Sequence, residues 1–538
     1  MRIILDSDIT TLVILLIASI ILLCVLADKF SDKLGMPALI MFMFIGMLFG
    51  SDGIFKISFD NFEWANNVCS IALIFIMFYG GFNTKWKAAK EVAAKAVTLS
   101  TLGVVLTAGI TMILCRIFLG FSWQESFLIG AVLSSTDAAS VFAILRKKKL
   151  NLKDGTASIL EVESGSNDPV AYMLTVIAIN MICSDTSNNI FVMILLQIIF
   201  GITIGILFAK ITVAIREKTH LISEGLDTIY VIAMVLGCYG MTDALGGNAY
   251  LSIYLMGILV GNSKIKNKQM MIPFFDGITS LAQILIFFLL GLLTFPSQMP
   301  PIIPKAIAIV FFLTVVARPI SVYILLKPQK CSLWQQVLIS WAGLRGASSS
   351  VFAIMAVANG VAMRYDLFHI VFAVSLFSVG IQGTLLPYMS KRLRMVDENA
   401  DVRKTFNDYQ EESTIALVSM AIAEGHQWEN QYIRDIDLPT GALALMIKRG
   451  NETIVTKGNT KIHAGDNLIL NVPTYEPGAA EELLETTITK NHPWCNKKIG
   501  ELNLKSNELI VTILRDKENI IPNGQTMILE DDIVVTYR

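Results

Sequence analysis

Charged side chains are scarce in this sequence: they make up 16% of its 538 residues, whereas hydrophobic residues make up 54%. Soluble domains commonly carry about 25% charged residues, so the composition excludes an ordinary soluble protein. Apolar runs recur at about the 20 residues that a helix needs to cross a bilayer. The sequence lacks the alternating segments of about ten residues that characterise membrane β-barrels. These features predict an all-α polytopic membrane protein.

Several motifs are also missing, and each absence excludes a class of function. The seven cysteines form no C-x-x-C pair, which leaves buried thiols as their interpretation. No G-x-G-D motif supports an intramembrane aspartyl protease, and only His369 lies near an apolar run, which argues against serine-protease chemistry. We therefore expect no enzyme. A filter of the TVGYG kind is absent as well. A ligand-gated cation channel nevertheless stays the alternative function, because it too combines a pore with a cytosolic sensor.

The apolar runs predict thirteen transmembrane helices. The first has no small-residue cleavage site after it, so we interpret it as a span and not as a signal peptide. Alternate loops carry 18 Lys and Arg, whereas the intervening loops carry only Lys56, Arg116, Lys305 and Arg364. The positive-inside rule then places the N-terminus outside and the C-terminal tail in the cytoplasm of a plasma-membrane protein. The predicted spans are residues 9–27, 36–52, 66–82, 93–117, 124–145, 157–182, 189–213, 225–243, 247–262, 273–294, 303–326, 333–358 and 366–389.

The tail after the last span differs in charge and contains an internal repeat. Residues 396–538 hold 14 Lys and Arg against 23 Asp and Glu. The segment that begins at His426 reappears 66 residues later, with matching Trp428/Trp494, Arg449/Arg515 and Asp466/Asp532. Each copy has β-rich stretches bounded by Gly or Asn turns. We predict a membrane domain over residues 1–390, a linker over 391–413, and tandem cytosolic α+β modules over 414–475 and 476–538.

Polar residues interrupt the apolar spans at three places. They are SSTD, with Thr136 and Asp137; ESGSNDP, with Glu163 and Asp168; and GLRGASSS, with Arg345. A charge at the bilayer centre costs at least ~2.5–3.5 kcal/mol on insertion scales. Several such residues on neighbouring spans, mixed with Gly, Ser and Pro, favour a hydrated ion site over an accident of sequence.

The spacing within the sixth span indicates how such a site could be built. Ser164 and Asp168 are four residues apart and share a helix face. Pro169 has no amide proton, so a backbone carbonyl one turn earlier is left free, which is tolerated in a membrane where it lines a cavity. Carboxylate, hydroxyl and carbonyl oxygens suit Na⁺, K⁺ or H⁺.

The SSTD and GLRGASSS segments resemble breaks in two discontinuous helices. They lie seven spans apart, as expected for two six-span inverted repeats around a connecting span, and crossing discontinuous helices mark transporter sites. Asp137 could then offset helix N-termini and Arg345 helix C-termini.

On these motifs the chain resembles the monovalent cation:proton antiporters of the NhaP and sodium/proton-exchanger type, over about residues 5–392. ADKFSDKLGMPALIMFMFIGMLFGSDGI and FYGGFNTKW look most like the cell-volume-regulation protein A branch, which handles K⁺ or Na⁺. The resemblance implies a homodimer with a moving core and a monovalent cation and proton shared at Asp168. Asn167 in place of a second aspartate implies electroneutral exchange. The remaining site residues that it implies are Asn167, Ser164, Thr136 and Asp137 at the ion, with Glu163 paired to Arg318.

The tail copies resemble the C-terminal half of the domains that regulate K⁺ conductance (TrkA-C-like). Such modules bind small cytosolic ligands, so the resemblance implies a regulatory ligand, with a nucleotide as one candidate. No residue of the tail identifies that ligand. The predicted function is secondary active exchange of K⁺ or Na⁺ for H⁺ by alternating access, in the lipid bilayer, with neither a cofactor nor a nucleic acid polymer as partner.

Overall fold

The computed structural model divides the chain into two compact units, Met1–Val402 and Arg403–Arg538. It describes residues 9–34, 37–84, 86–148, 150–183, 189–218, 226–263, 268–396, 415–438, 442–450, 452–473, 483–490, 492–502, 509–515, 518–520 and 522–537. Most of the predicted linker, residues 397–413, lies outside these ranges. Its first residues belong to the membrane unit, where the Lys153 amide donates to the Met395 carbonyl (2.9 Å) and Leu152 pairs with Val396.

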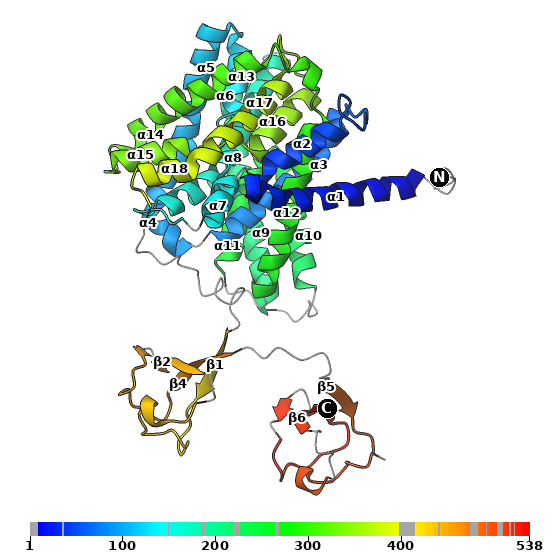
Figure 1. The fold of residues 1–538 in the computed structure, drawn as a ribbon, viewed down its shortest axis with the longest axis vertical. Helices are drawn as coiled ribbons and strands as arrows, with labels where there is room; N and C mark the ends of the chain where they lie inside the picture. The colour runs from blue at the N-terminus through cyan, green and yellow to red at the C-terminus, as the bar shows by residue number, and fades with distance from the viewer. Residues whose placement is uncertain are drawn as a thin grey trace. The chain divides into compact units, whose positions relative to one another are not determined.

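The first unit is a bundle of helices (Figure 1). Short polar residues begin several of them: Ser122 caps one helix together with Glu125, and Asn61, Ser332 and Asp366 accept hydrogen bonds from the first turns of others. The α-helices are α1 (Ile9–Leu34), α2 (Ala38–Phe49), α3 (Phe62–Asn83), α4 (Trp86–Thr98), α5 (Val104–Leu119), α6 (Trp123–Val132), α7 (Ala138–Lys147), α8 (Thr156–Cys183), α9 (Ile190–Lys218), α10 (Asp227–Ala244), α11 (Ala249–Gly261), α12 (Lys268–Leu292), α13 (Ile303–Phe311), α14 (Arg318–Leu326), α15 (Leu333–Trp341), α16 (Ala347–Ala358), α17 (Leu367–Phe377) and α18 (Thr384–Arg392).

Helices lie over every segment that the sequence analysis interpreted as a span, but five of those segments are not plain α-helices. Two are broken, between α6 and α7 and between α15 and α16. Three contain π-helical turns: η2 (Leu99–Gly103), η4 (Phe312–Ala317) and η5 (Ser378–Gly383). Within the described residues, 7 helical segments are long and apolar enough to cross a membrane unaided.

Small residues set the distance between neighbouring helices. A Cβ added at Gly291 of α12 would lie 2.1 Å from the Met43 carbonyl oxygen of α2, and one added at Gly257 of α11 would lie 2.4 Å from the Phe78 carbonyl oxygen of α3. Backbones therefore touch at these crossings, as is typical of helices that associate inside a membrane.

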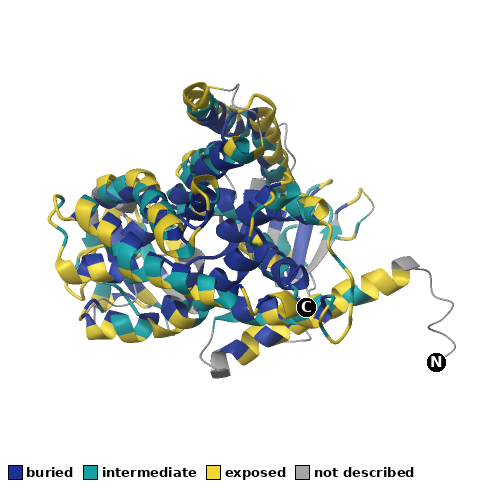
Figure 2. Cartoon of the chain, turned by 90° about the horizontal axis from the view of Figure 1, so that it is seen from above, coloured by how far each residue is buried: buried dark blue, intermediate teal, exposed yellow. Residues whose placement is uncertain are grey.

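Burial is uneven across the bundle (Figure 2). α8 and α16 are mostly buried, whereas α1 exposes a continuous row of large apolar side chains, among them Leu12, Ile14 and Leu22. In an apolar stretch of 18 residues, only 11% of the residues of α1 and 22% of those of α9 are buried. α8 and α16, which carry polar motifs, are thus covered by other helices, and the exposed apolar faces are suited to lipid or to a second subunit.

The second unit contains two four-stranded antiparallel sheets with the same topology, β1-β4-β2-β3 and β5-β8-β6-β7. A register shift occurs between Ala444 and Met446 in β2, and the same irregularity recurs 66 residues later between Ile510 and Thr512 in β6. The strands are β1 (Ile415–Ala421), β2 (Leu443–Arg449), β3 (Glu452–Val455), β4 (Asn467–Pro473), β5 (Leu483–Thr487), β6 (Leu509–Arg515), β7 (Glu518–Ile520) and β8 (Ile533–Tyr537).

The expectation of α+β modules is only coarsely met, because the described residues of the tail are β-rich. Their helical content is two short 3₁₀ turns, at Ile433–Asp435 and Ile499–Glu501. The β-branched and aliphatic residues that alternate in each copy favour strands. Gly and Asn form the turns that connect these strands.

Each tail module contains an ion pair between an arginine and a buried aspartate. Arg449 donates from Nε (2.7 Å) and Nη2 (2.8 Å) to the two carboxylate oxygens of Asp466, which is fully buried. These hydrogen bonds hold the pKa of Asp466 below its ordinary value. Arg515 and Asp532 repeat the geometry; there, burial acts to raise the pKa of Asp532, but hydrogen bonds from Arg515 and the Leu529 amide outweigh it. The repeated arginines are therefore engaged inside their own modules.

We expect Arg449→Met to destabilise the first tail module by about 1.5–3 kcal/mol, since it removes hydrogen bonds to a buried charge. A lowered folded pKa contributes stability that is present above the unfolded value of about 3.9 and is lost as the pH falls through the folded value. Limited proteolysis of the full chain should show a tail that resists cleavage at pH 7 and opens below about pH 4, and a variant that is cleaved already at pH 7. Arg434→Met, at a mostly exposed side chain, is the control; equal cleavage of both variants would contradict the role of the pair.

Candidate ion-binding site

The two helix breaks meet in the middle of the membrane unit. The Asp137 amide, in the break between α6 and α7, donates to the Leu344 carbonyl in the break between α15 and α16 (2.8 Å). A Cβ added at Gly346 would lie 1.9 Å from Asp137 Oδ2, so a residue with a side chain does not fit at this point. The breaks thus place extended backbone from both segments beside α8.

The Asp168 carboxylate of α8 lies next to this crossing and is 3% exposed. It accepts a short hydrogen bond from Ser135 Oγ in the first break, and one from Ser348 Oγ at the start of α16 (2.6 Å). In the described part of the chain, no Lys, Arg or His forms an ion pair with it. A buried carboxylate held only by hydroxyl groups is costly unless a proton or a cation neutralises it.

Neighbouring polar groups supply further oxygen atoms. Asn167 donates from Nδ2 to Thr136 Oγ1 (2.5 Å), and Ser164 Oγ donates to the Thr136 carbonyl (2.7 Å). Asn167 Oδ1 is buried and has no hydrogen-bond partner among the described residues. The residue before Asp168 therefore carries an acceptor oxygen that these residues leave unused.

Charged residues also cap the half-helices at the crossing. Asp137 accepts from the Ser140 amide (3.1 Å) and Ser140 Oγ (2.6 Å) at the start of α7. Arg345 donates from Nη1 to the Ser135 carbonyl (2.6 Å), beyond the end of α6. A negative group at an N-terminus and a positive group at a C-terminal carbonyl both stabilise the exposed helix ends.

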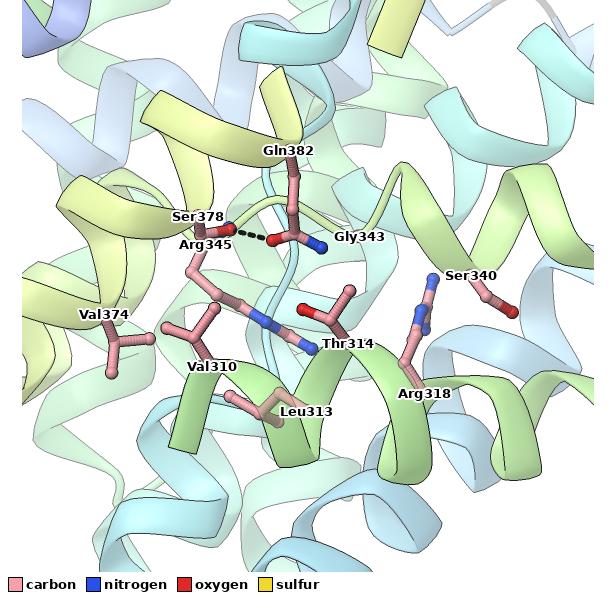
Figure 3. Close-up of a pocket in the computed structure, with 10 residues that line it drawn as sticks. All are labelled: Val310, Leu313, Thr314, Arg318, Ser340, Gly343, Arg345, Val374, Ser378 and Gln382. Atoms are coloured by element: carbon pink, nitrogen blue, oxygen red, sulfur yellow. Dashed lines mark hydrogen bonds between the residues drawn. The ribbon is translucent and has the colours of Figure 1, made fainter. Parts of the chain in front are cut away.

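A second charged pair lies beside the crossing. Arg318 donates from Nη2 to Glu163 Oε1, and both side chains are almost fully buried. Figure 3 shows the Arg318 and Arg345 side chains facing a small cavity of about 10 Å³ with Thr314 between them. Behind Arg345, the Ser378 hydroxyl of η5 accepts from the Arg345 amide (3.1 Å) and donates to Gln382 (2.5 Å). The two arginines are thus fixed by α8, by the first break and by the π-helical turn η5.

A larger cavity of about 650 Å³ approaches the crossing from the side of the α7–α8 loop. Its walls come from α1, α2 and α12 on one flank and from α7, η5 and α18 on the other. Ser140, which bonds Asp137, lines it, and so does Lys148 near the loop between α7 and α8. The cavity therefore connects the side of the α7–α8 loop with the neighbourhood of the two breaks.

The chain matches the transmembrane sodium/hydrogen exchanger family over residues 16–392. It belongs to that family. Residues 483–535 match the TrkA-C domain, as the resemblance in the second tail copy predicted. The K⁺/H⁺ antiporter NhaP of Alkalimonas amylolytica is 32% identical over 464 residues, which are 85% of this chain and 81% of that protein. The K⁺/H⁺ antiporter NhaP2 of Shewanella baltica is 31% identical over 451 residues, 82% of this chain and 78% of that protein.

The fold of this exchanger is shared with a solved structure. The sodium proton antiporter MjNhaP1 from Methanocaldococcus jannaschii aligns with a TM-score of 0.63 and 20% sequence identity, and the match covers 71% of this chain and 99% of that one. At this identity the likeness shows the fold alone: a helical membrane antiporter fold.

The structure brings together the residues that were selected from the sequence, but their hydrogen-bond partners differ from the expected ones. Asp168, Asn167, Thr136 and Ser164 adjoin one another, and Glu163 bonds Arg318. The hydroxyl groups that bond the Asp168 carboxylate, however, are those of Ser135 and Ser348, which sequence reasoning did not select. Both lie inside the SSTD and GLRGASSS motifs, so the motifs pointed to the right segments without distinguishing their serines.

We expect Arg318→Met to destabilise the protein by about 3–5 kcal/mol, because it strands the buried Glu163 charge. The double variant Glu163→Gln, Arg318→Met should recover most of that loss, since neither charge is then left alone. Thermal unfolding of the purified full chain measures both effects. Arg364→Met, at an exposed arginine, is the control for losing a positive charge. Additive destabilisation in the double variant would show that the pair is not coupled.

Proposed function

We propose that this exchanger carries monovalent cations in exchange for protons, and that Asp168 is the group that both ions share. The observation that carries the proposal is the buried Asp168 carboxylate with only hydroxyl partners. A proton neutralises it as an acid, and a cation neutralises it as an ion pair, so the two ions compete for one position. Thr136, Ser164 and Asn167 support the cation around it, as Asn167 Oδ1 has room for a further partner.

Competition for one carboxylate couples the two fluxes. The bare carboxylate is expensive to carry through a dry barrier, whereas the protonated and the cation-loaded forms are neutral. Only loaded forms therefore change access from one side to the other. One proton replaces one monovalent cation, which makes the exchange electroneutral. A channel would need an open path to both sides at once, whereas the 650 Å³ cavity reaches the crossing from the side of the α7–α8 loop, which favours alternating access instead.

We infer a topology of thirteen spans with an inverted repeat of six spans on each side of a connecting span. Two pairs of features support it. The broken helices α6–α7 and α15–α16 are the fifth and twelfth predicted spans, and the π-helical turns η2 and η4 occur in the fourth and eleventh. Both pairs are seven spans apart, as two copies of one unit require. Glu163 and Arg318, with Asp137 and Arg345, hold the two copies together at the crossing.

The loop charges support an orientation with the N-terminus outside and the tail in the cytoplasm of the plasma membrane. The 650 Å³ cavity then faces the cytoplasm, because Lys148 lines it. The exposed apolar faces of α1 and α9 are the surfaces we assign to a homodimer in the bilayer.

K⁺ is the cation that we assign first, with Na⁺ as the second, because the curated relatives over most of this length are named K⁺/H⁺ antiporters. The two tail modules form the regulatory part and take a small cytosolic ligand, a nucleotide among the candidates. Their arginines are engaged by Asp466 and Asp532, so the ligand is recognised by other groups. The domain limits that we assign are residues 1–390 for transport, 391–413 for the linker, and 414–475 and 476–538 for the modules.

We expect Asp168→Asn to fold and to lose exchange, because an amide neither releases a proton nor balances a cation. In proteoliposomes with an imposed pH gradient, K⁺ should dissipate the gradient for the unmodified protein, Na⁺ less so, and Li⁺ least. The variant should behave like empty liposomes with all three cations. Asp60→Asn, at an exposed carboxylate, should exchange normally. Cation-driven proton flux through the Asp168 variant would overturn the assignment.

We expect a chain that ends at residue 402 to keep exchange with a changed rate, because the helix breaks and Asp168 lie wholly in the first unit. The same pH-gradient assay measures it, with full-length protein as the reference. Loss of exchange from a truncated protein that still unfolds at the full-length temperature would contradict a purely regulatory tail.

A further inference from the structure

α11 touches α8 directly beside Asp168. Asn248 precedes α11, is 2% exposed and uses its groups on three partners. Its backbone amide donates to the backbone carbonyl of Gln197 in α9 (3.0 Å), and its side-chain Oδ1 accepts from the Leu251 backbone amide (3.0 Å). Its Nδ2 donates to the Pro169 carbonyl (2.7 Å). Asn248 therefore ties α9 and α11 to the residue that follows Asp168.

One turn before Asp168, the same helix makes a second contact. The Tyr254 ring lies against Gly165, where an added Cβ would be 2.7 Å from the ring. The hydroxyls of Tyr254 and Ser166 share a hydrogen bond of 3.2 Å, and Tyr254 is 3% exposed. Only a glycine at 165 lets the tyrosine lie flat on α8. The two contacts thus bracket Asp168 along its helix.

Aromatic rings fill the space between these helices beyond Asp168. The Tyr172 ring of α8 lies 4.9 Å from Tyr250 of α11 and 5.9 Å from Phe352 of α16. Tyr172 is C-terminal to Asp168, whereas the N-terminal end of α8 follows the loop after Lys148, which lines the large cavity. The rings and the Asn248 contact are therefore on the side of Asp168 that faces away from the cavity.

We propose that Asn248 and Tyr254 are positioning residues that hold α8 against α11, and that the Asn248–Pro169 contact closes the ion site on the side opposite the cavity. The proposal rests on the proposed alternating access. In that mechanism, the site must also open on the closed side, so α8 must move relative to α11, and the Asn248–Pro169 and Tyr254–Ser166 hydrogen bonds then break. They form in one access state and not in the other, so they set the balance between the two states.

The same contacts explain three residues of α8 that have no role at the ion site. Gly165 provides the flat surface for Tyr254, Ser166 provides its hydroxyl partner, and Pro169 presents its carbonyl to Asn248. A proline is well suited to that position, because its ring fixes the backbone of α8 next to the carboxylate. The Gly, Ser and Pro of ESGSNDP thus fit a helix that is held against α11.

The test reads the two sides of the site with cysteines. In full-length protein in nanodiscs, with Cys24, Cys183, Cys331 and Cys495 replaced by alanine or serine, Ala143→Cys reports on the cavity, which Ala143 lines. Ala171→Cys reports on the closed side, because Ala171 is buried beyond Asp168. The rate of reaction with N-ethylmaleimide is compared with and without Asn248→Ser or Tyr254→Phe. Serine at 248 keeps an oxygen to cap α11 but does not reach the Pro169 carbonyl. Tyr388→Phe, at an exposed tyrosine, is the matched control.

One hydrogen bond is worth about 0.5–1.5 kcal/mol net, so each variant should shift the balance roughly 2- to 10-fold. The cysteine at 143 should react more slowly by that factor and the one at 171 faster, with no change in Tyr388→Phe. Unchanged rates at both positions would overturn the proposal, and so would rates that rise together, because that is local loosening and not a shift between states. The labelling rates do not depend on transport. If the Asp168→Asn variant still exchanged ions, the proposed role of Asp168 would be wrong, but the labelling rates would still test the contacts of Asn248 and Tyr254.

Discussion

The rest of this structure depends on one constraint: a buried carboxylate that no cationic side chain of the described residues neutralises. Asp168 is held by Ser135 and Ser348, which come from two helices broken beside it. Had Arg318 or Arg345 reached it, the site would be a permanent ion pair with nothing to exchange. Instead, Glu163 engages Arg318 and the Ser135 carbonyl engages Arg345. The arginines stabilise the breaks, while the partners of Asp168 among the described residues are hydroxyl groups.

The two helix breaks are tolerated because they are enclosed. Backbone groups without helical partners are costly in lipid but not where protein or a wet cavity surrounds them. α8 and α16 are accordingly buried, while the long uninterrupted helices α1 and α9 expose their apolar faces. Close glycine contacts between α2 and α12, and between α3 and α11, make a rigid frame. The polar crossing and the frame meet along a cavity on one flank and along the contacts of α11 on the other.

Sequence reasoning selected segments that converge in the structure, because intramembrane charge is rare and its motifs are dense. The segments with Thr136, Asp168, Arg318 and Arg345 all converge, and the repeat in the tail has one topology in both copies, even to its register shift. It was less successful on individual oxygens. It also did not predict that the Pro169 carbonyl accepts a hydrogen bond from Asn248, about 80 residues away in the chain, which no local pattern reveals. The tail modules proved β-rich in their described residues, because strand preference exceeds helix preference there.

The sequence by itself determined that this is a helical membrane protein of the sodium/hydrogen exchanger family, because length, hydropathy and rare charged motifs act locally along the chain. Only the tertiary structure decided which hydroxyls bond Asp168 and which residues of α11 contact α8. Those contacts join residues far apart in sequence, and their existence depends on how closely whole helices approach one another. Such distances are set by packing across the bundle, at Gly165 and Gly346 above all, and not by the residues next to them in the chain.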